Sequence, residues 1–159
     1  MYAFTLNMLI ANVWLLLSRD PGVPSFAIGF LIGFGLLALF GDVLPGGRRY
    51  VRRVLALISF ALYFVRLFLI ANFSVAATVL FRSNDRLHPN FITYDVSALN
   101  PGEILLLSYC ITLTPGTVSI RIDDAFHTLT LHALDAQNPD AIRAGIDRSL
   151  TQRILRFTR

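Results

Sequence analysis

Residues 54–81, with the sequence VLALISFALYFVRLFLIANFSVAATVLF, decide the fold of the first half of the chain. They form its longest apolar run, and as a helix they would extend roughly 42 Å at 1.5 Å per residue. The hydrocarbon core of a bilayer is about 30 Å thick. The run therefore predicts a membrane helix that tilts or protrudes.

Two polar residues interrupt this run, Arg66 near its middle and Asn72. An arginine at the centre of a bilayer costs at least ~2.5 kcal/mol, so we expect Arg66 to face protein, a carboxylate or water. No acidic residue in the apolar segments of the chain can pair with it. We therefore favour an anchor at an interface with a neighbouring subunit. A site in an ion path, or snorkelling to the membrane surface, is the alternative.

Two shorter apolar segments precede the long run, at residues 1–18 and 25–40. Their lengths lie near the lower limit for crossing a bilayer, so residues 1–81 are predicted to form a transmembrane helical region of two or three helices. The first segment lacks a basic leader and a cleavage site, so we expect a retained anchor. Gly29 and Gly33 have the G-x-x-x-G spacing that permits close helix approach, which makes them a candidate docking face. Glycine is also common in membrane helices, and that alternative is equally good.

Residues 41–53 are predicted to form a loop that contains a basic cluster. Its four arginines are Arg48, Arg49, Arg52 and Arg53. Such a cluster favours a cytoplasmic location for the loop. If all three apolar segments cross the membrane, however, the loop and the C-terminal part lie on opposite sides. Arg82 and Arg86 flank the other end of the long run, so we place the C-terminal part in the cytoplasm and leave two or three spans open.

Three short segments after residue 82 alternate between apolar and polar residues, as half-buried strands do. The first, residues 91–97, directs Ile92, Tyr94 and Val96 to one face. The second, residues 117–122, is predicted to direct Val118, Ile120 and Ile122 inward. The third, residues 128–134, directs Leu129, Leu131 and Ala133 inward.

Two helix starts are visible between and after these strands. Asn100 can cap a helix, Pro101 suits its first position, and Glu103 completes a capping box. Asn138 and Pro139 repeat the signal. They begin a last helix with an apolar stripe at a spacing of four: Ile142, Ile146, Leu150 and Ile154. Residues 82–159 are thus predicted to form a small cytoplasmic α+β domain of order βαββα.

The composition agrees with a membrane protein and excludes several other classes. Hydrophobic residues make up 55% of the chain and charged residues 15%, whereas about a quarter of a soluble domain is charged. The net charge of +4 is dispersed, and no arginine cluster alternates with aromatic residues, so we expect no nucleic acid partner. The single cysteine, Cys110, excludes an internal disulfide and a cysteine-based zinc site.

No pattern provides the chemistry of an enzyme. The histidines are isolated, no nucleophile has a supporting base, and there is no phosphate-binding glycine motif. We therefore predict no catalytic residue, no metal and no cofactor. Unaided ion transport is also disfavoured. Arg66 is the one charged residue inside the apolar segments, and arginine does not release its proton near neutral pH.

Residues 111–118, ITLTPGTV, and residues 131–135, LHALD, together resemble the signature of the E subunit of Mrp-type (also called Mnh or Pha) monovalent cation/proton antiporters. Segments 12–18 and 71–75 resemble the same family in the same order, so the resemblance covers nearly the whole chain. It departs at residues 108–110, SYC, where the family usually has a small residue pair, A-N. The motif residues are Thr112, Thr114, Pro115, Gly116, Thr117, His132 and Asp135.

The resemblance implies an accessory subunit in a multi-pass complex of the bacterial inner membrane. Such complexes have six or seven subunits and exchange Na⁺, or in some members K⁺, for protons. Their large subunits carry the proton path, and the E subunit is implied to support assembly and activity, with its C-terminal domain at the cytoplasmic face. The implied partners are the other subunits and the lipid membrane. The transported cation and the stoichiometry stay open.

Two other functions remain as alternatives at this point. The first is a membrane-anchored binding module whose domain captures a soluble cytoplasmic partner. The second is a small self-assembled channel that uses Arg66 with the Gly29 and Gly33 strip. Co-purification separates the first from an antiporter subunit, and conductance in planar bilayers tests the second.

Overall fold

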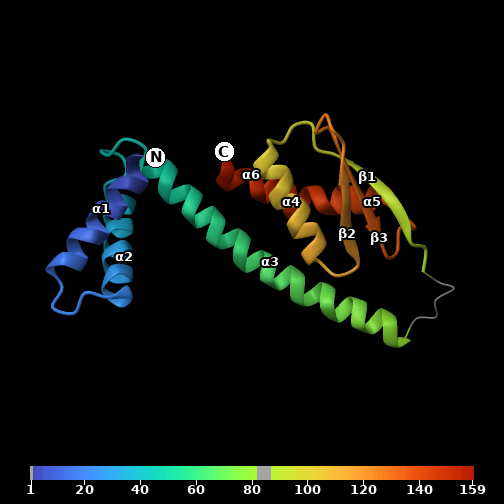
Figure 1. Cartoon of the computed structure of the whole chain (residues 1–159), viewed down its shortest axis with the longest axis horizontal. Coiled ribbons are helices and arrows are strands. Elements are labelled where there is room, and N and C mark those ends of the chain that lie inside the picture. Colours follow the sequence, from blue (N-terminus) through green and yellow to red (C-terminus); the bar gives the residue numbers. More distant parts are fainter. Residues whose placement is uncertain (1, 82–86) are drawn as a thin grey trace. The chain divides into compact units, whose positions relative to one another are not determined.

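The structure is a computed structural model that describes residues 2–81 and 87–159 (Figure 1). The chain divides into two compact units, one that ends at Ala56 and one from Leu57 to Arg159. The long helix α3 (Gly47–Phe81) contributes to both. The predicted order, a helical N-terminal part followed by a small βαββα domain, is confirmed.

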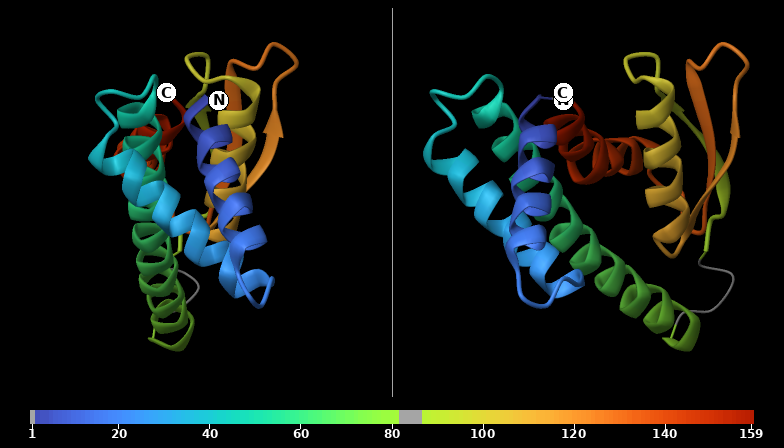
Figure 2. Two further views of the ribbon diagram at one scale, coloured as in Figure 1. Left: turned by 90° about the vertical axis from the view of Figure 1, so that its left-hand side faces the viewer. Right: turned by 60° about the vertical axis from the view of Figure 1, so that its left-hand side comes forward.

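In the first unit, α1 (Tyr2–Leu17) and α2 (Val23–Leu39) pack side by side (Figure 2). Both arise from apolar runs without internal proline, and a proline in the first turn begins α2. Each helix buries every fourth residue against the other. The buried residues are Ala3, Asn7 and Ala11 of α1 and Gly29, Gly33 and Leu37 of α2. These mostly small residues allow the two backbones to approach closely.

The predicted loop at residues 41–53 is wrong in its second half. Helix α3 begins at Gly47, so the four arginines occupy its first two turns instead of a loop. Arginine is a good helix former. The chain breaks earlier, at Gly46, whose φ of 78° lies in the left-handed region that favours glycine. The turn proper therefore spans only residues 40–46.

Among the described helices, α3 is the one whose length and hydropathy suffice to cross a membrane. It has 35 residues, which corresponds to roughly 52 Å. That exceeds the hydrocarbon core even after the arginine-bearing turns are set aside. Helices α1 and α2 are also apolar, but they have only 16 and 17 residues.

In the second unit, a three-stranded antiparallel sheet has the order β1-β3-β2. The strands are β1 (Asn90–Asp95), β2 (Thr117–Ile122) and β3 (Thr128–Ala133). The helices are α4 (Pro101–Leu113), α5 (Pro139–Ile146), the π-helical turn η2 (Asp147–Thr151) and α6 (Gln152–Thr158). They cover one face of the sheet (Figure 2). The core between the two layers is aliphatic, and residues of β1, β3, α4 and the last helices form it.

The predicted inward faces of β1 and β3 are confirmed, but that of β2 is partly wrong. Val118 and Ile120 are 39% and 54% exposed, whereas Ile122 packs against the core. A β-bulge between Ser119 and Arg121 reverses the alternation. Ser119 faces α4 instead, because its hydroxyl donates to the Ser108 carbonyl at 3.2 Å. A simple period of two does not reveal a bulge.

The apolar stripe of the last helix is confirmed and crosses the π-helical turn. Ile146, Leu150 and Ile154 are buried and Ile142 packs against the same core. In a regular α-helix a spacing of four drifts by about 40° per step, since each residue advances 100°. The wider turn at Asp147–Thr151 offsets this drift, so the stripe stays directed at the sheet.

Candidate functional site

The ITLTPGT motif ends α4 and starts β2 through hydrogen bonds of its threonines. The Thr114 hydroxyl donates to the Cys110 carbonyl at 2.8 Å, and the Thr117 hydroxyl donates to the Ile111 carbonyl at 3.0 Å. Thr112 accepts from the Ser119 backbone N–H at 3.2 Å. The two hydroxyl donors reinforce the last turn of α4, where the Thr114 N–H also donates to the Cys110 and Ile111 carbonyls. The motif threonines therefore fix the angle between helix and strand.

Pro115 and Gly116 make the turn itself and connect it to other elements. Gly116 has a φ of 94°, which disfavours any residue with a side chain. Its carbonyl accepts from the Leu134 N–H at 2.8 Å, directly after β3. A Cβ at Gly116 would lie 3.4 Å from Val75 of α3. The turn thus lies where α4, β3 and α3 meet.

The second motif, LHALD, places residues on both faces of β3. Leu131 and Ala133 are buried in the core. The His132 ring lies on the open face of the sheet, 5.3 Å from the Phe91 ring in an edge contact. Asp135 is half-buried in the turn that follows. His132 therefore has an aromatic neighbour, which is the environment of a structural histidine rather than of a metal ligand.

Glu103 joins the start of α4 to the end of α6. The predicted capping box with Asn100 is present. In addition, Glu103 accepts from Arg159 at 3.0 Å and from the Thr158 hydroxyl at 2.7 Å. Its side chain is 1% exposed. The hydrogen bond from the Arg159 guanidinium lowers the pKa of the Glu103 carboxyl to about 2, so the group is ionised at neutral pH.

Gly29 and Gly33 lie against α1. A Cβ at Gly29 would lie 2.7 Å from the Trp14 Cβ and 3.0 Å from the Ala11 backbone. A Cβ at Gly33 would lie 2.2 Å from the Asn7 side-chain oxygen. Gly29 requires glycine because a side chain would meet the Ala11 backbone, and a side chain at Gly33 would displace the Asn7 amide. The G-x-x-x-G face packs inside this chain in the structure.

Asn7 and Tyr50 tie the start of α3 to the helix pair. Asn7 is fully buried, and its amide donates to the Tyr50 hydroxyl at 2.9 Å. The Tyr50 ring also contacts the rings of Phe4 and Phe34 at 6.2 and 6.1 Å. A buried amide is costly without a hydrogen bond, so this contact specifies how the three helix segments meet.

Arg66 and Asn72 are both exposed on α3. Asn72 donates to the Phe68 carbonyl one turn earlier, at 2.8 Å. Within residues 2–81 and 87–159, Arg66 has no hydrogen-bond or ionic partner. It lies roughly 130° around the helix from Phe60, Phe64 and Leu67, at 3.6 residues per turn. The structure therefore does not bring Arg66 together with the motif residues.

The face of α3 with Phe60, Phe64 and Leu67 packs against the sheet domain of the second unit. The Phe60 ring lies 5.4 Å from the Phe157 ring, and Arg153 stacks 3.7 Å from the centre of the Tyr63 ring. Phe60 is buried in the same aliphatic core as the sheet. The face opposite is open to the surroundings. It carries Leu62, Leu69 and Phe73, each at least half exposed.

The chemistry of the described residues is structural. No group of three or more His, Cys, Asp or Glu side chains could hold a metal ion within the described ranges. Burial raises the pKa of the Cys110 thiol to about 11, which keeps it protonated and unreactive. The arrangement presents surfaces and contacts, and we find no constellation for a reaction.

Three contacts could not be predicted from the motifs: Glu103 with Arg159, Asn7 with Tyr50, and Arg153 with Tyr63. Asn7 leaves a trace in the sequence, as one of two asparagines in a largely apolar helix. The partners in each pair lie at least 43 residues apart in the chain. No local pattern specifies such pairs.

The sequence matches known proteins over most of its length. Residues 7–157 match the family MNHE, described as Na⁺/H⁺ ion antiporter subunit. The chain is 33% identical over 145 residues to Na⁺/H⁺ antiporter subunit E1 of Staphylococcus haemolyticus (strain JCSC1435), covering 91% of this chain and 90% of that relative. It is 32% identical over 147 residues to subunit E1 of Staphylococcus aureus (strain JH9), covering 90% and 91%.

Two solved structures match this chain, and the first of them has a similar fold. A chain of the membrane-bound sulfane sulfur reductase, an archaeal respiratory membrane complex, matches with a TM-score of 0.56 and 22% identity, over 95% of this chain and 98% of that chain. A chain of the Mrp complex from Dietzia sp. DQ12-45-1b matches with a TM-score of 0.46 and 24% identity, over 62% and 96%. The fold of this chain is thus similar to that of the sulfane sulfur reductase chain over almost its whole length.

Proposed function

This chain belongs to the family of Na⁺/H⁺ ion antiporter subunits, and from that premise we propose that it is an accessory subunit of a multisubunit Na⁺(K⁺)/H⁺ antiporter complex. Its role is to support assembly and activity of the subunits that translocate ions. Its partners are those subunits and the surrounding lipid. It performs no enzymatic reaction of its own.

The observation that carries this proposal is the scarcity of titratable groups in the apolar segments. Residues 1–18, 25–40 and 54–81 contain one charged side chain, Arg66. Proton carriers keep Asp, Glu, Lys or His within the membrane, since these groups take up and release protons there. An arginine does not. Protons therefore cross the membrane on other chains, and this one acts through contact with them.

Arg66 is the residue that we assign to such a contact. It is exposed on the face of α3 that does not pack on the domain. In a membrane a guanidinium needs a partner, and a carboxylate of a neighbouring subunit provides one. Arg66→Leu should lower recovery of the complex several-fold after mild-detergent purification. Asn72→Ala on the same helix is the control and should leave recovery unchanged.

We place the chain in the bacterial cell membrane as a multi-pass protein, with residues 82–159 in the cytoplasm. If α1, α2 and α3 all cross, the turn at residues 40–46 lies outside. Pro45→Cys and Ala125→Cys are exposed reporters for the two sides. An impermeant maleimide should label Pro45→Cys in intact spheroplasts and Ala125→Cys only in inverted vesicles. The reverse pattern contradicts the orientation, and labelling of both from one side contradicts three spans.

The packing of α3 on the domain bears on this topology. Phe60 and Phe64 lie in the part of α3 that would be in lipid, yet they contact the domain. We propose that lipid or a neighbouring subunit replaces this contact when the complex assembles. A photoreactive phenylalanine at position 157 should cross-link to α3 in the isolated chain and lose that cross-link in the complex. If the cross-link persists in the complex, the domain still contacts α3 there, and the proposed replacement of this contact is contradicted.

Deletion tests the function as a whole. Removal of this chain from an otherwise complete complex should lower Na⁺/H⁺ exchange in inverted vesicles and reduce recovery of the large subunits. A host that lacks its antiporters should regain Na⁺ resistance with the full set of subunits but not with this chain alone. Co-purification of a soluble protein in place of polytopic subunits would instead support a membrane-anchored binding module.

A further inference from the structure

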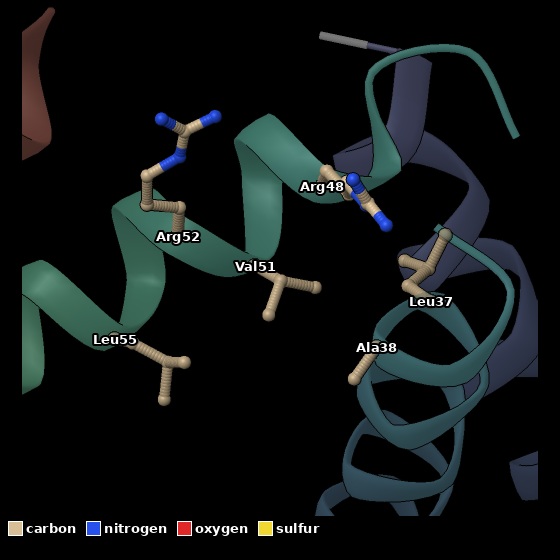
Figure 3. A pocket seen from close by; sticks show the side chains of 6 residues that line it. All are labelled: Leu37, Ala38, Arg48, Val51, Arg52 and Leu55. Carbon is tan, nitrogen blue, oxygen red and sulfur yellow. The ribbon is translucent and has the colours of Figure 1, made fainter. Parts of the chain in front are cut away.

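The first turns of α3 and the end of α2 form an open crevice of about 420 Å³ within the first unit (Figure 3). Two arginines, Arg48 and Arg52, line it together with four apolar residues. Those residues are Leu37, Ala38, Val51 and Leu55. Figure 3 shows Val51 and Leu55 on the side of α3 toward Ala38, while the Arg52 guanidinium extends away from Leu55. The crevice thus has an apolar floor and a basic rim.

The rim carries more positive charge than the protein neutralises. Arg48 and Arg52 are four positions apart in the sequence and so lie on one helix face, one turn apart. Arg48 pairs with Asp42. Arg52 has no ionic or hydrogen-bond partner among the residues that the structure describes. Asp42 is the one acidic residue between Asp20 and Asp85 in the sequence.

The position of the arginines on the helix adds to this excess. The start of a helix carries a partial positive charge, and acidic residues are the stabilising ones there. The first turn of α3 contains none. The positive charge of Arg48 and Arg52 therefore lies at the end of α3 where the helix dipole disfavours it. An anion held at this rim offsets that charge.

We propose that the crevice binds one anionic phospholipid, with its phosphate on Arg48 and Arg52 and an acyl chain along Val51 and Leu55. Guanidinium groups bind phosphate oxygens through pairs of N–H donors, so the rim matches a phosphodiester. A free phosphate would use the rim but leave the apolar floor exposed. Leu55 is 54% exposed where the apolar run of α3 begins, so an acyl chain that extends from the rim would contact apolar side chains.

The proposal rests on membrane insertion of α3 but not on the antiporter role, so it is tested by lipid binding rather than by transport. The full chain in mild detergent is titrated with phosphatidylglycerol or with phosphatidylcholine, and bound lipid is counted by native mass spectrometry. We expect phosphatidylglycerol to bind at least fivefold more tightly. Arg52→Gln should remove most of that preference, because one arginine near a lipid phosphate contributes about a fivefold factor.

Arg49→Gln is the matched control, since it removes the same charge from the same turn but does not line the crevice. It should change phosphatidylglycerol binding by less than twofold. An equal loss in Arg49→Gln and Arg52→Gln would show diffuse electrostatic attraction and overturn the site. Displacement of the lipid by equimolar inorganic phosphate would reduce it to an anion site without lipid. Loss of the lipid when the complex assembles would assign the crevice to a neighbouring subunit and also overturn the proposal.

Discussion

In the unit that ends at Ala56, helices α1 and α2 bury mostly small residues and expose large apolar ones, whereas the sheet domain in the unit from Leu57 buries large aliphatic residues. In the first, Ala11, Gly29 and Gly33 are buried while Leu16 and Leu17 are 83% and 78% exposed. In the second, Leu107 and Leu131 have no exposed surface. The two units therefore gain stability in different ways.

This difference indicates what each unit needs from its surroundings. When the outer side chains of a helix pair are apolar and lie in lipid, the hydrophobic effect does not hold the two helices together. Close packing of the two backbones stabilises the pair instead. The sheet and its helices bury a core of large apolar side chains, so the hydrophobic effect stabilises them. Helix α3 joins the two modes of packing, because its apolar run from Leu57 belongs to the second unit and yet exposes large side chains such as Phe73. The following substitutions test the contrast, from the largest expected effect to the smallest.

Leu131→Ala removes a fully buried side chain from the centre of β3. The lost contacts and the resulting cavity should lower the free energy of unfolding of the second unit by about 3 kcal/mol. Hydrogen exchange of β1 and β3 peptides, read by mass spectrometry in mild detergent, measures the change. Trp14 fluorescence, which reports the first unit, should not change. A parallel shift of Trp14 would show that the two units unfold together.

Gly29→Ala places a methyl group against the Ala11 backbone and Trp14, which cannot move aside without separating the helices. We expect the helix pair to lose about 2 kcal/mol, as in other overpacked interfaces. Thermal unfolding followed by Trp14 fluorescence measures it. Gly35→Ala is the control on the same helix, since nothing lies within 4 Å of its Cβ. Equal effects of the two substitutions would contradict packing through small residues.

Glu103→Gln keeps the shape of the side chain but removes its ion pair with Arg159. The expected loss is about 1.5 kcal/mol at neutral pH, the low end for hydrogen bonds to charged groups because Arg159 is half exposed. Urea unfolding of the second unit measures it. A stability equal to that of the unsubstituted chain would show that the pair is not stabilising.

The same pair gives a pH dependence with a definite sign. The folded pKa of Glu103 is about 2, below its ordinary value of 4.5. The stabilisation is therefore complete above about pH 4.5 and is lost as the pH falls toward 2. The unfolding free energy of the unsubstituted chain should fall more steeply across this window than that of Glu103→Gln. Parallel curves would exclude Glu103 as the source.

Ile120→Thr changes an apolar residue at the bulge of β2 that is 54% exposed. Its effect on the unfolding of the isolated chain should stay within about 0.5 kcal/mol, since little is buried there. Hydrogen exchange of the β2 peptide measures this change, and the value is compared with that for Leu131→Ala. A loss comparable to that of Leu131→Ala would mean that Ile120 faces the core, as the alternation alone predicts.

Much of the fold follows from local patterns. The capping box at Asn100 and Glu103 correctly predicts the start of α4, and the spacing of four from Ile142 to Ile154 predicts the stripe of the last helix. These signals are reliable because each arises from neighbours within one or two turns. The strand faces of β1 and β3 are specified in the same way by their period of two.

The departures have physical causes beyond local pattern. The bulge at β2 lies beside Ser119, which bonds to α4 twice, and no alternation encodes such bonds. The arginines at residues 48–53 indicate a loop by charge, but they extend α3 because arginine supports helix and Gly46 provides the break. Contacts such as Asn7 with Tyr50 join distant segments. The crevice at Arg48 and Arg52 likewise appears only when α2 and α3 are placed together.

The central claim is that this chain contributes to antiport without moving protons itself. The most direct measurement reconstitutes the purified full chain alone into liposomes that contain a pH-sensitive dye, and then imposes a Na⁺ gradient. We predict no Na⁺-dependent proton movement above that of empty liposomes, while the complete complex in parallel liposomes responds. Sodium-dependent acidification or alkalinisation by the chain alone would contradict the account.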